Sequence, residues 1–148
     1  LFLNQRKYLM DLIHLAELTY TRKAENPTEV NIKYRCEERE LLEDPTLYRK
    51  LVGSLIYLTI TRPDISYAVH TVSKFMQAPT HLHLSAVHRI IKYILGTPNR
   101  GLFFPTDSTL QLSAYSDSDW GGCPDTRKST SGWCMFLGDS LISWKCKK

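Results

Sequence analysis

Asp117 and Asp119 are the carboxylates in this chain best suited to bind a metal or take part in catalysis. They lie in the run YSDSDW. Side chains of a β-strand alternate between its faces, so these two point the same way if the strand continues through Ser118. Several carboxylates around paired Mg²⁺ ions can activate a water and stabilise a leaving oxygen. One carboxylate alone binds Mg²⁺ weakly, and Asp and Ser are also common where a strand simply ends in a turn.

Short strands with a period of two are predicted around these carboxylates. Residues 101–104 form a strand candidate, residues 105–109 read as a loop, and Leu110, Leu112 and Ala114 then alternate with polar residues. This alternation predicts a strand that covers a core with one face and ends at Gly121 and Gly122. Two apolar runs, residues 131–137 and 141–144, flank Gly138-Asp139 and predict a hairpin.

The first part of the chain predicts helices. Residues 1–3 read as the end of a strand whose partner lies upstream, and Asn4 as the N-cap of a helix over residues 5–20. A polar connection over residues 21–43 follows, with mixed charges in residues 33–40 that favour a solvated loop.

Three further amphipathic helices are predicted with short links between them. Asp44 is expected as an N-cap with Pro45 in the first turn, and Leu47, Leu51, Leu55 and Leu58 then line one face to residue 61. A second helix starts at Arg62-Pro63 and ends at Pro79. Thr80 caps a third, which stops at Gly96 and Pro98. Together they predict a small helical bundle.

Histidines and cationic side chains give weaker signals. His81, His83 and His88 lack a nearby carboxylate at ligand spacing, so we interpret them as surface residues. A solvated face is the simpler interpretation of the cations, and a phosphate-binding face is the alternative. The candidate nucleic-acid-binding residues are Lys74, Arg89, Lys92, Arg100, Arg127 and Lys128.

Composition sets the remaining limits. The chain has 148 residues, 43% of them hydrophobic, and a formal net charge of +4, which fits a nucleic-acid partner and many ordinary proteins alike. Its 4 cysteines form no CxxC pair, so we expect buried reduced thiols at Cys36, Cys123, Cys134 and Cys146. No run is apolar and long enough for a membrane span, which favours a soluble, intracellular protein. Both ends look cut from something larger.

Two blocks of sequence resemble a known family. The runs YRKLVGSLIYLTITRPDISYAVHTVSKFM and AVHRIIKYILGT precede YSDSDWGGCPDTRKSTSGWCMFLGDSLISWKCKK. In this order they resemble the pol polyprotein of Ty1/copia-type retrotransposons, plant members above all. The resemblance implies the C-terminal part of a reverse transcriptase followed by the start of a ribonuclease H domain. The expected fold is α+β, with a thumb- or connection-like bundle over residues 1–100 and an incomplete ribonuclease H-like antiparallel sheet of short strands over residues 101–148.

The resemblance also assigns roles. It implies that Asp117 is the first Mg²⁺ ligand of ribonuclease H, whereas Asp119 matches the pattern without being a catalytic ligand. The next ligand of the family, a Glu on a later helix, has no counterpart before Lys148. No adjacent aspartate pair of the polymerase type occurs either. We therefore expect no catalysis and no tightly bound Mg²⁺ from this chain alone, although the parent uses Mg²⁺ on template–primer and RNA–DNA hybrid.

Two alternatives of other classes stay open. One is a non-catalytic nucleic-acid-binding module that uses the six cationic residues. The other is an interaction protein that self-associates through an exposed strand edge, with a poorly soluble C-terminal third. The resemblance leaves the compartment open between cytoplasm, nucleus and plant mitochondrion.

Overall fold

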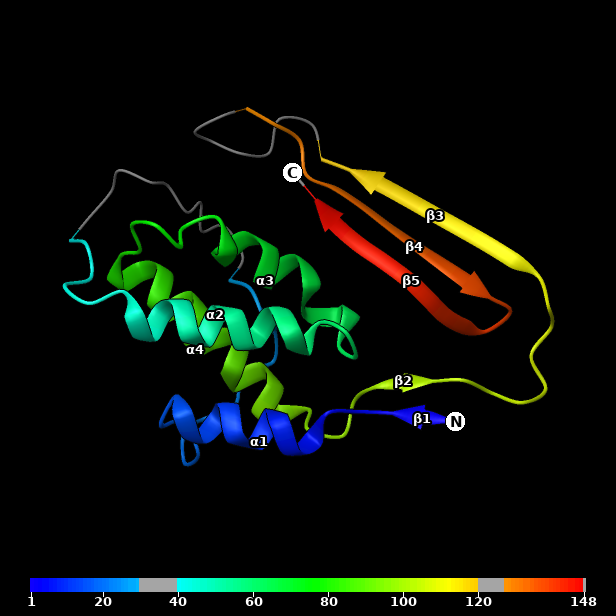
Figure 1. Cartoon of the computed structure of the whole chain (residues 1–148), viewed down its shortest axis with the longest axis horizontal. Helices are drawn as coiled ribbons and strands as arrows, with labels where there is room; N and C mark the ends of the chain where they lie inside the picture. The colour runs from blue at the N-terminus through cyan, green and yellow to red at the C-terminus, as the bar shows by residue number, and fades with distance from the viewer. Residues whose placement is uncertain (30–39, 120–126, 148) are drawn as a thin grey trace.

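The computed structural model describes residues 1–29, 40–119 and 127–147. The predictions at Cys36, Gly121, Gly122 and Cys123, and most of the run 33–40, lie outside these residues. Four α-helices precede a small antiparallel sheet, so the expected α+β class is confirmed (Figure 1). The helices are α1 (Arg6–Leu15), α2 (Thr46–Leu58), α3 (Ser66–Ser73) and α4 (His81–Gly96), with a 3₁₀ turn at Pro63–Ile65. The strands are β1 (Phe2–Leu3), β2 (Leu102–Phe103), β3 (Leu112–Ser118), β4 (Ser131–Leu137) and β5 (Ser140–Lys147).

The first helix is shorter than its sequence pattern predicted. Gln5, not Asn4, occupies the N-cap position, and the Asn4 side chain accepts a long bond of 3.4 Å from the Arg6 amide. Helix α1 ends at Leu15 rather than Tyr20, because Glu17 takes a left-handed φ of 57°. The backbone then turns through a bond from the Leu18 amide to the Ile13 carbonyl, which ends the helical repeat.

The other helix boundaries follow their capping residues to different degrees. Asp44 accepts a 2.9 Å bond from the Thr46 amide as expected, although Pro45 itself takes the N-cap position of α2. Thr80 caps α4 as predicted, through a reciprocal box with His83. The second predicted helix is wrong in length, because it splits into the 3₁₀ turn and α3 and ends at Ser73.

The core lies among the four helices. Helix α2 contacts each of the other three, and its residues Leu51, Leu55 and Leu58 are buried as predicted. Leu47 is exposed, contrary to the prediction, and Tyr48 takes its place against α3, where its hydroxyl donates to the Val72 carbonyl at 2.6 Å. The apolar stripe of α2 therefore contains a polar group that is satisfied inside the core.

The short strand β1 has a different partner from the one expected. Residues 2 and 3 pair antiparallel with Phe103 and Leu102 of β2, which lies downstream and not upstream. The N-terminal ammonium and carbonyl of Leu1 extend this pairing to Phe104. Strand β2, predicted as part of residues 101–104, therefore links the two parts of the chain that the sequence separates at residue 100.

The three-stranded sheet has the order β3-β4-β5, and all its pairs are antiparallel. The predicted hairpin at residues 138–139 joins β4 to β5, and Gly138 takes a φ of 57° there. A Cβ at Gly138 would lie 2.0 Å from the Ser108 hydroxyl, so the turn needs glycine for both reasons. The pairing of β4 with β5 shifts its register between Met135 and Phe136, which interrupts the period of two there.

The bundle covers one face of this sheet at β5, beside α3. The Trp144 indole of β5 donates to the Thr59 carbonyl at the end of α2, at 3.2 Å. Strand β3 forms the opposite edge of the sheet from β5, which makes this contact (Figure 1). The prediction that the Leu110–Leu112 face covers a core is wrong in the described structure, where these side chains are 89% and 59% exposed.

Candidate functional site

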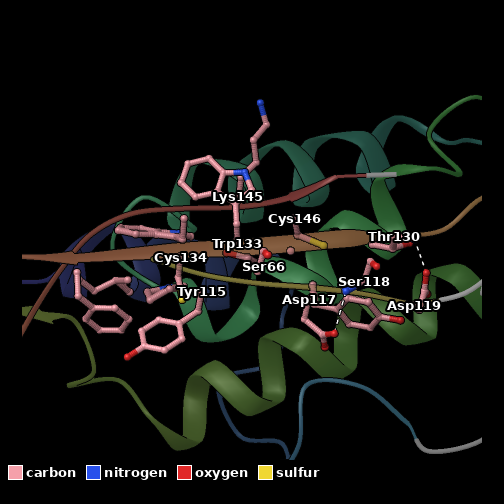
Figure 2. A pocket seen from close by; sticks show the side chains of 17 residues that line it. Ser66, Tyr115, Asp117, Ser118, Asp119, Thr130, Trp133, Cys134, Lys145 and Cys146 are labelled. Atoms are coloured by element: carbon pink, nitrogen blue, oxygen red, sulfur yellow. Dashed lines mark hydrogen bonds between the residues drawn. The ribbon is translucent and has the colours of Figure 1, made fainter. Parts of the chain in front are cut away.

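A groove separates the start of α3 from the inner face of the sheet. It has a volume of about 530 Å³ and receives residues from all three long strands. Figure 2 shows the side chains that line the groove, among them Tyr115 and Asp117 of β3, Cys134 of β4 and Cys146 of β5. The sequence pattern predicted the strands, but it gave no signal that α3 supplies the opposite wall.

Asp117 reaches this groove from an exposed position near the end of β3. The register places it opposite Gly132 of β4, which has no side chain to crowd the carboxylate. Its Oδ1 accepts a 2.8 Å bond from the Ser118 amide and has no other partner in the described part of the chain. The carboxylate therefore keeps most of its acceptor capacity for a ligand.

Asp119 lines the same groove but serves a different purpose. Its amide donates to the Thr130 carbonyl at 3.0 Å, and its Oδ1 accepts from the Thr130 amide. These reciprocal bonds extend the pairing of β3 and β4 beyond the last strand residue. Both aspartates line the groove, and the hydrogen bonds leave Asp117 the freer of the two for binding.

The groove does not supply a complete site for paired Mg²⁺ ions. Within residues 1–29, 40–119 and 127–147, no group of three or more His, Cys, Asp or Glu side chains is gathered so as to hold a metal. Mg²⁺ prefers oxygen ligands in octahedral geometry, and the donors here are two carboxylates, one of them already hydrogen-bonded. The weak Mg²⁺ binding expected of Asp117 alone stays a prediction.

Two cysteine thiols line the groove. Cys134 and Cys146 are free and only half-buried, so the expectation that they are buried is wrong. Burial raises the pKa of Cys146, and the negative charge of Asp119 adds to this, whereas Lys74 acts in the opposite direction. A thiol with a raised pKa is a poor nucleophile at neutral pH, so Cys146 is not a catalytic candidate.

The six cationic candidates are distributed over several parts of the fold. Lys74 follows α3 and lies near Cys146, whereas Arg127 and Lys128 are exposed just before β4. On α4, Arg89 pairs with Glu29 at 3.1 Å, which neutralises part of its charge. Arg100 lies beyond α4 at another cluster, where it bonds the Tyr93 hydroxyl.

The buried guanidinium of Arg62 lies at the centre of that cluster. The sequence analysis did not predict this role. Arg62 is 1% exposed and donates to both carboxylate oxygens of Asp64, at 2.9 and 2.8 Å. It also donates to the carbonyl and hydroxyl of Thr97, at 3.0 and 2.8 Å. The Tyr93 hydroxyl donates to Asp64 and accepts from Arg100. The Arg-Pro-Asp run thereby holds the start of α3 against the end of α4. The run itself was the one sequence signal that pointed to this contact.

The electrostatics of Asp64 predict a pH dependence of stability. Burial by itself raises the pKa of this carboxyl, but the hydrogen bonds and charge of Arg62 and the Tyr93 hydroxyl outweigh it, so the pKa lies below its ordinary value. The ionised form then stabilises the fold fully above about pH 4, and this contribution is lost as pH falls through the folded-state pKa. Urea unfolding between about pH 5 and pH 3 is expected to show a steeper loss for the wild type than for Asp64→Asn. Parallel curves for the two proteins would contradict this assignment.

The histidines divide between surface and core. His81 is exposed, as predicted, but His83 is 1% exposed, so its interpretation as a surface residue is wrong. Its Nδ1 accepts from the Thr80 amide at 3.0 Å, and its ring stacks on Phe75 at 3.9 Å between centroids. At His88, burial and the nearby Lys92 charge lower the pKa, which favours the neutral ring. His83 is therefore a capping residue of α4.

Comparison with known proteins adds the relationship that geometry alone cannot supply. No protein-family model and no solved structure matches the chain. It is 46% identical over its full 148 residues to the Retrovirus-related Pol polyprotein from transposon RE1 of Arabidopsis thaliana, and spans 10% of that polyprotein. Two uncharacterized mitochondrial proteins of the same plant are also similar. One is 39% identical over the whole chain and 61% of its own length, and the other is 48% identical over 55% of the chain and 74% of its own length.

The sequence that forms this helical bundle and sheet is thus similar to a segment of two plant retrotransposon polyproteins. The chain is homologous to a segment of the Ty1/copia-type retrotransposon Pol polyproteins of plants and to mitochondrial open reading frames. It spans about a tenth of the length of those polyproteins. In the described part of the chain, no helix has the length and apolar character needed to cross a membrane.

Proposed function

We propose that the chain is the segment that joins the reverse-transcriptase thumb to ribonuclease H in a retrotransposon polyprotein. In this role the helical bundle holds the backbone of the template–primer, and β3 presents Asp117 as the first Mg²⁺-binding carboxylate. Mg²⁺ would there support hydrolysis of the RNA strand of a hybrid. The observation that supports this most directly is the position of Asp117, exposed in a groove and free of structural bonds except one to Ser118.

In this proposal the catalytic activity belongs to the longer polyprotein and not to the 148-residue chain by itself. We expect the chain by itself to be catalytically inactive. This expectation rests on the first-carboxylate role proposed for Asp117 and on the lack of an adjacent aspartate pair in the sequence. Two variants of the protein test this on an RNA–DNA hybrid with Mg²⁺. One is the 148-residue chain, and the other continues into the sequence that follows the matching segment in the RE1 polyprotein. Cleavage by the longer chain alone is the expected result, and cleavage by the 148-residue chain would refute the proposed inactivity.

A second candidate function is self-association through the outer edge of β3. This strand has a partner only on its β4 side among the described residues, and Leu110, Leu112 and Tyr115 near it are 89%, 59% and 64% exposed. Unpaired strand edges with exposed apolar side chains favour pairing with another chain. Light scattering over a dilution series is expected to show a dimer or larger species that dissociates on dilution. An Ala114→Pro variant, which places proline on this edge strand, is expected to shift the equilibrium toward monomer. A folded chain that stays monomeric at every concentration would exclude this function.

A further inference from the structure

A second groove lies against the C-terminal end of α4, away from the aspartates. It has a volume of about 820 Å³ between the segment 22–27 and the residues Tyr93, Gly96, Thr97 and Arg100. The segment is fixed to the helix, because the Ala24 amide donates to the Lys92 carbonyl at 3.3 Å. A Cβ at Gly96 would meet the Lys23 Cβ at 3.5 Å, which shows how directly the two walls approach.

The charge of this groove is positive. Arg22, Lys23 and Arg100 line it, and Glu25 is the one acidic side chain among its described lining residues. Arg22 and Lys23 are exposed, and neither makes a hydrogen bond or ion pair in the described part of the chain. Their ammonium and guanidinium groups are therefore available to a ligand, unlike that of Arg89, which pairs with Glu29.

Arg100 is held in place at the opposite wall. Its Nη1 donates to the Tyr93 hydroxyl at 2.7 Å and lies 3.6 Å from Asp64, and its guanidinium carbon lies 5.9 Å from the centre of the Tyr93 ring. The Nε and Nη2 groups make no hydrogen bond to the described residues. Such a guanidinium loses less side-chain entropy on binding, because it is already oriented.

The end of a helix normally repels an anion, because its last carbonyls are unpaired. Here two of the last four carbonyls, those of Tyr93 and Ile94, have partners. Lys92 accepts from Ala24, Tyr93 from the Thr97 hydroxyl, and Ile94 from the Thr97 amide. The Thr97 carbonyl accepts from Arg62 and from the Arg100 amide. Asp64 neutralises the buried Arg62 guanidinium beneath this end of the helix, so the positive charge left beside the groove is that of Arg100.

We infer that this groove binds a phosphodiester of a nucleic-acid backbone, with Arg22, Lys23 and Arg100 as its ligands. This deepens the proposed function, since it rests on contact between the bundle and a template–primer. Guanidinium groups suit phosphate because they offer paired donors in a fixed plane, and lysine adds a point charge. A site of this kind reads no base sequence, and its affinity falls as salt rises.

The test compares the 148-residue chain with Arg22→Gln/Lys23→Gln, both exposed positions where substitution leaves the fold intact. The matched control is Arg6→Gln/Lys7→Gln, an equally exposed Arg-Lys pair in the first turn of α1, which removes the same charge. Binding of a labelled RNA–DNA hybrid is measured by fluorescence anisotropy over a range of salt. The groove variant is expected to lower the slope of log affinity against log salt by about 2, and the control to leave it unchanged.

Each other outcome is decisive. An equal decrease of the salt slope in the two variants would show that binding depends on net charge and not on this groove. That result would overturn the inference, while the proposed contact with nucleic acid would stand. No binding by the wild type at low salt would overturn both. A titration with inorganic phosphate alone separates the two sources of phosphate. Tight binding of free phosphate without binding of the hybrid would overturn assignment to a nucleic-acid backbone.

Discussion

Replacing Arg62 with methionine is expected to lower the free energy of unfolding by about 3–5 kcal/mol. The side chain is 1% exposed, and its removal leaves the Asp64 carboxylate and the Thr97 carbonyl without their main donor. Asp64 is 26% exposed, so water compensates for part of the loss at that end only. Urea unfolding followed by circular dichroism at neutral pH measures the effect.

A matched control separates this cluster from ordinary ion pairs. Arg89→Met removes a pair with Glu29 in which the two side chains are 32% and 44% exposed, and it is expected to cost less than about 1 kcal/mol. The double variant Arg62→Met/Asp64→Asn tests the coupling, because neutralising the partner removes the uncompensated charge. It is expected to be more stable than Arg62→Met alone. Equal costs for Arg62→Met and Arg89→Met would show that the buried cluster contributes no more than a surface pair.

Asp117→Asn is expected to lower cleavage of an RNA–DNA hybrid by more than about 100-fold in the longer chain, beyond the loss typical of an outer-shell partner of a metal ligand. The amide preserves the shape of the side chain and its bond to Ser118, but it removes the negative charge that binds Mg²⁺. Initial rates at several Mg²⁺ concentrations measure the effect. A loss that is recovered at high Mg²⁺ would indicate weakened metal binding in particular.

Asp119→Asn provides the control for that substitution. The two aspartates line one groove, but the Asp119 side chain accepts from the Thr130 amide, a bond that asparagine keeps. We expect a loss of less than about 10-fold, within the range of outer-shell effects. If Asp119→Asn matched or exceeded Asp117→Asn, the assignment of the first carboxylate to Asp117 would be wrong.

Local sequence pattern determined the elements of this fold. The α+β class, the four helices, the cap at Thr80 and the hairpin at Gly138 follow from periodicity and from residues with special backbone or capping properties. These signals act over a few residues, so they are readable along the chain. Motif resemblance indicated the family that the comparisons support.

Tertiary structure alone decided which elements meet. Pattern could not show that β1 pairs with β2 a hundred residues away, that α3 forms the second wall of the groove, or that His83 is buried. The Arg62–Asp64 pair also depends on Tyr93 and Thr97, which come from another helix end. Burial and long-range hydrogen bonds are properties of packed neighbours, so a free Asp117, a structural Asp119 and a cationic groove at Arg22 are distinguished only when the chain is folded.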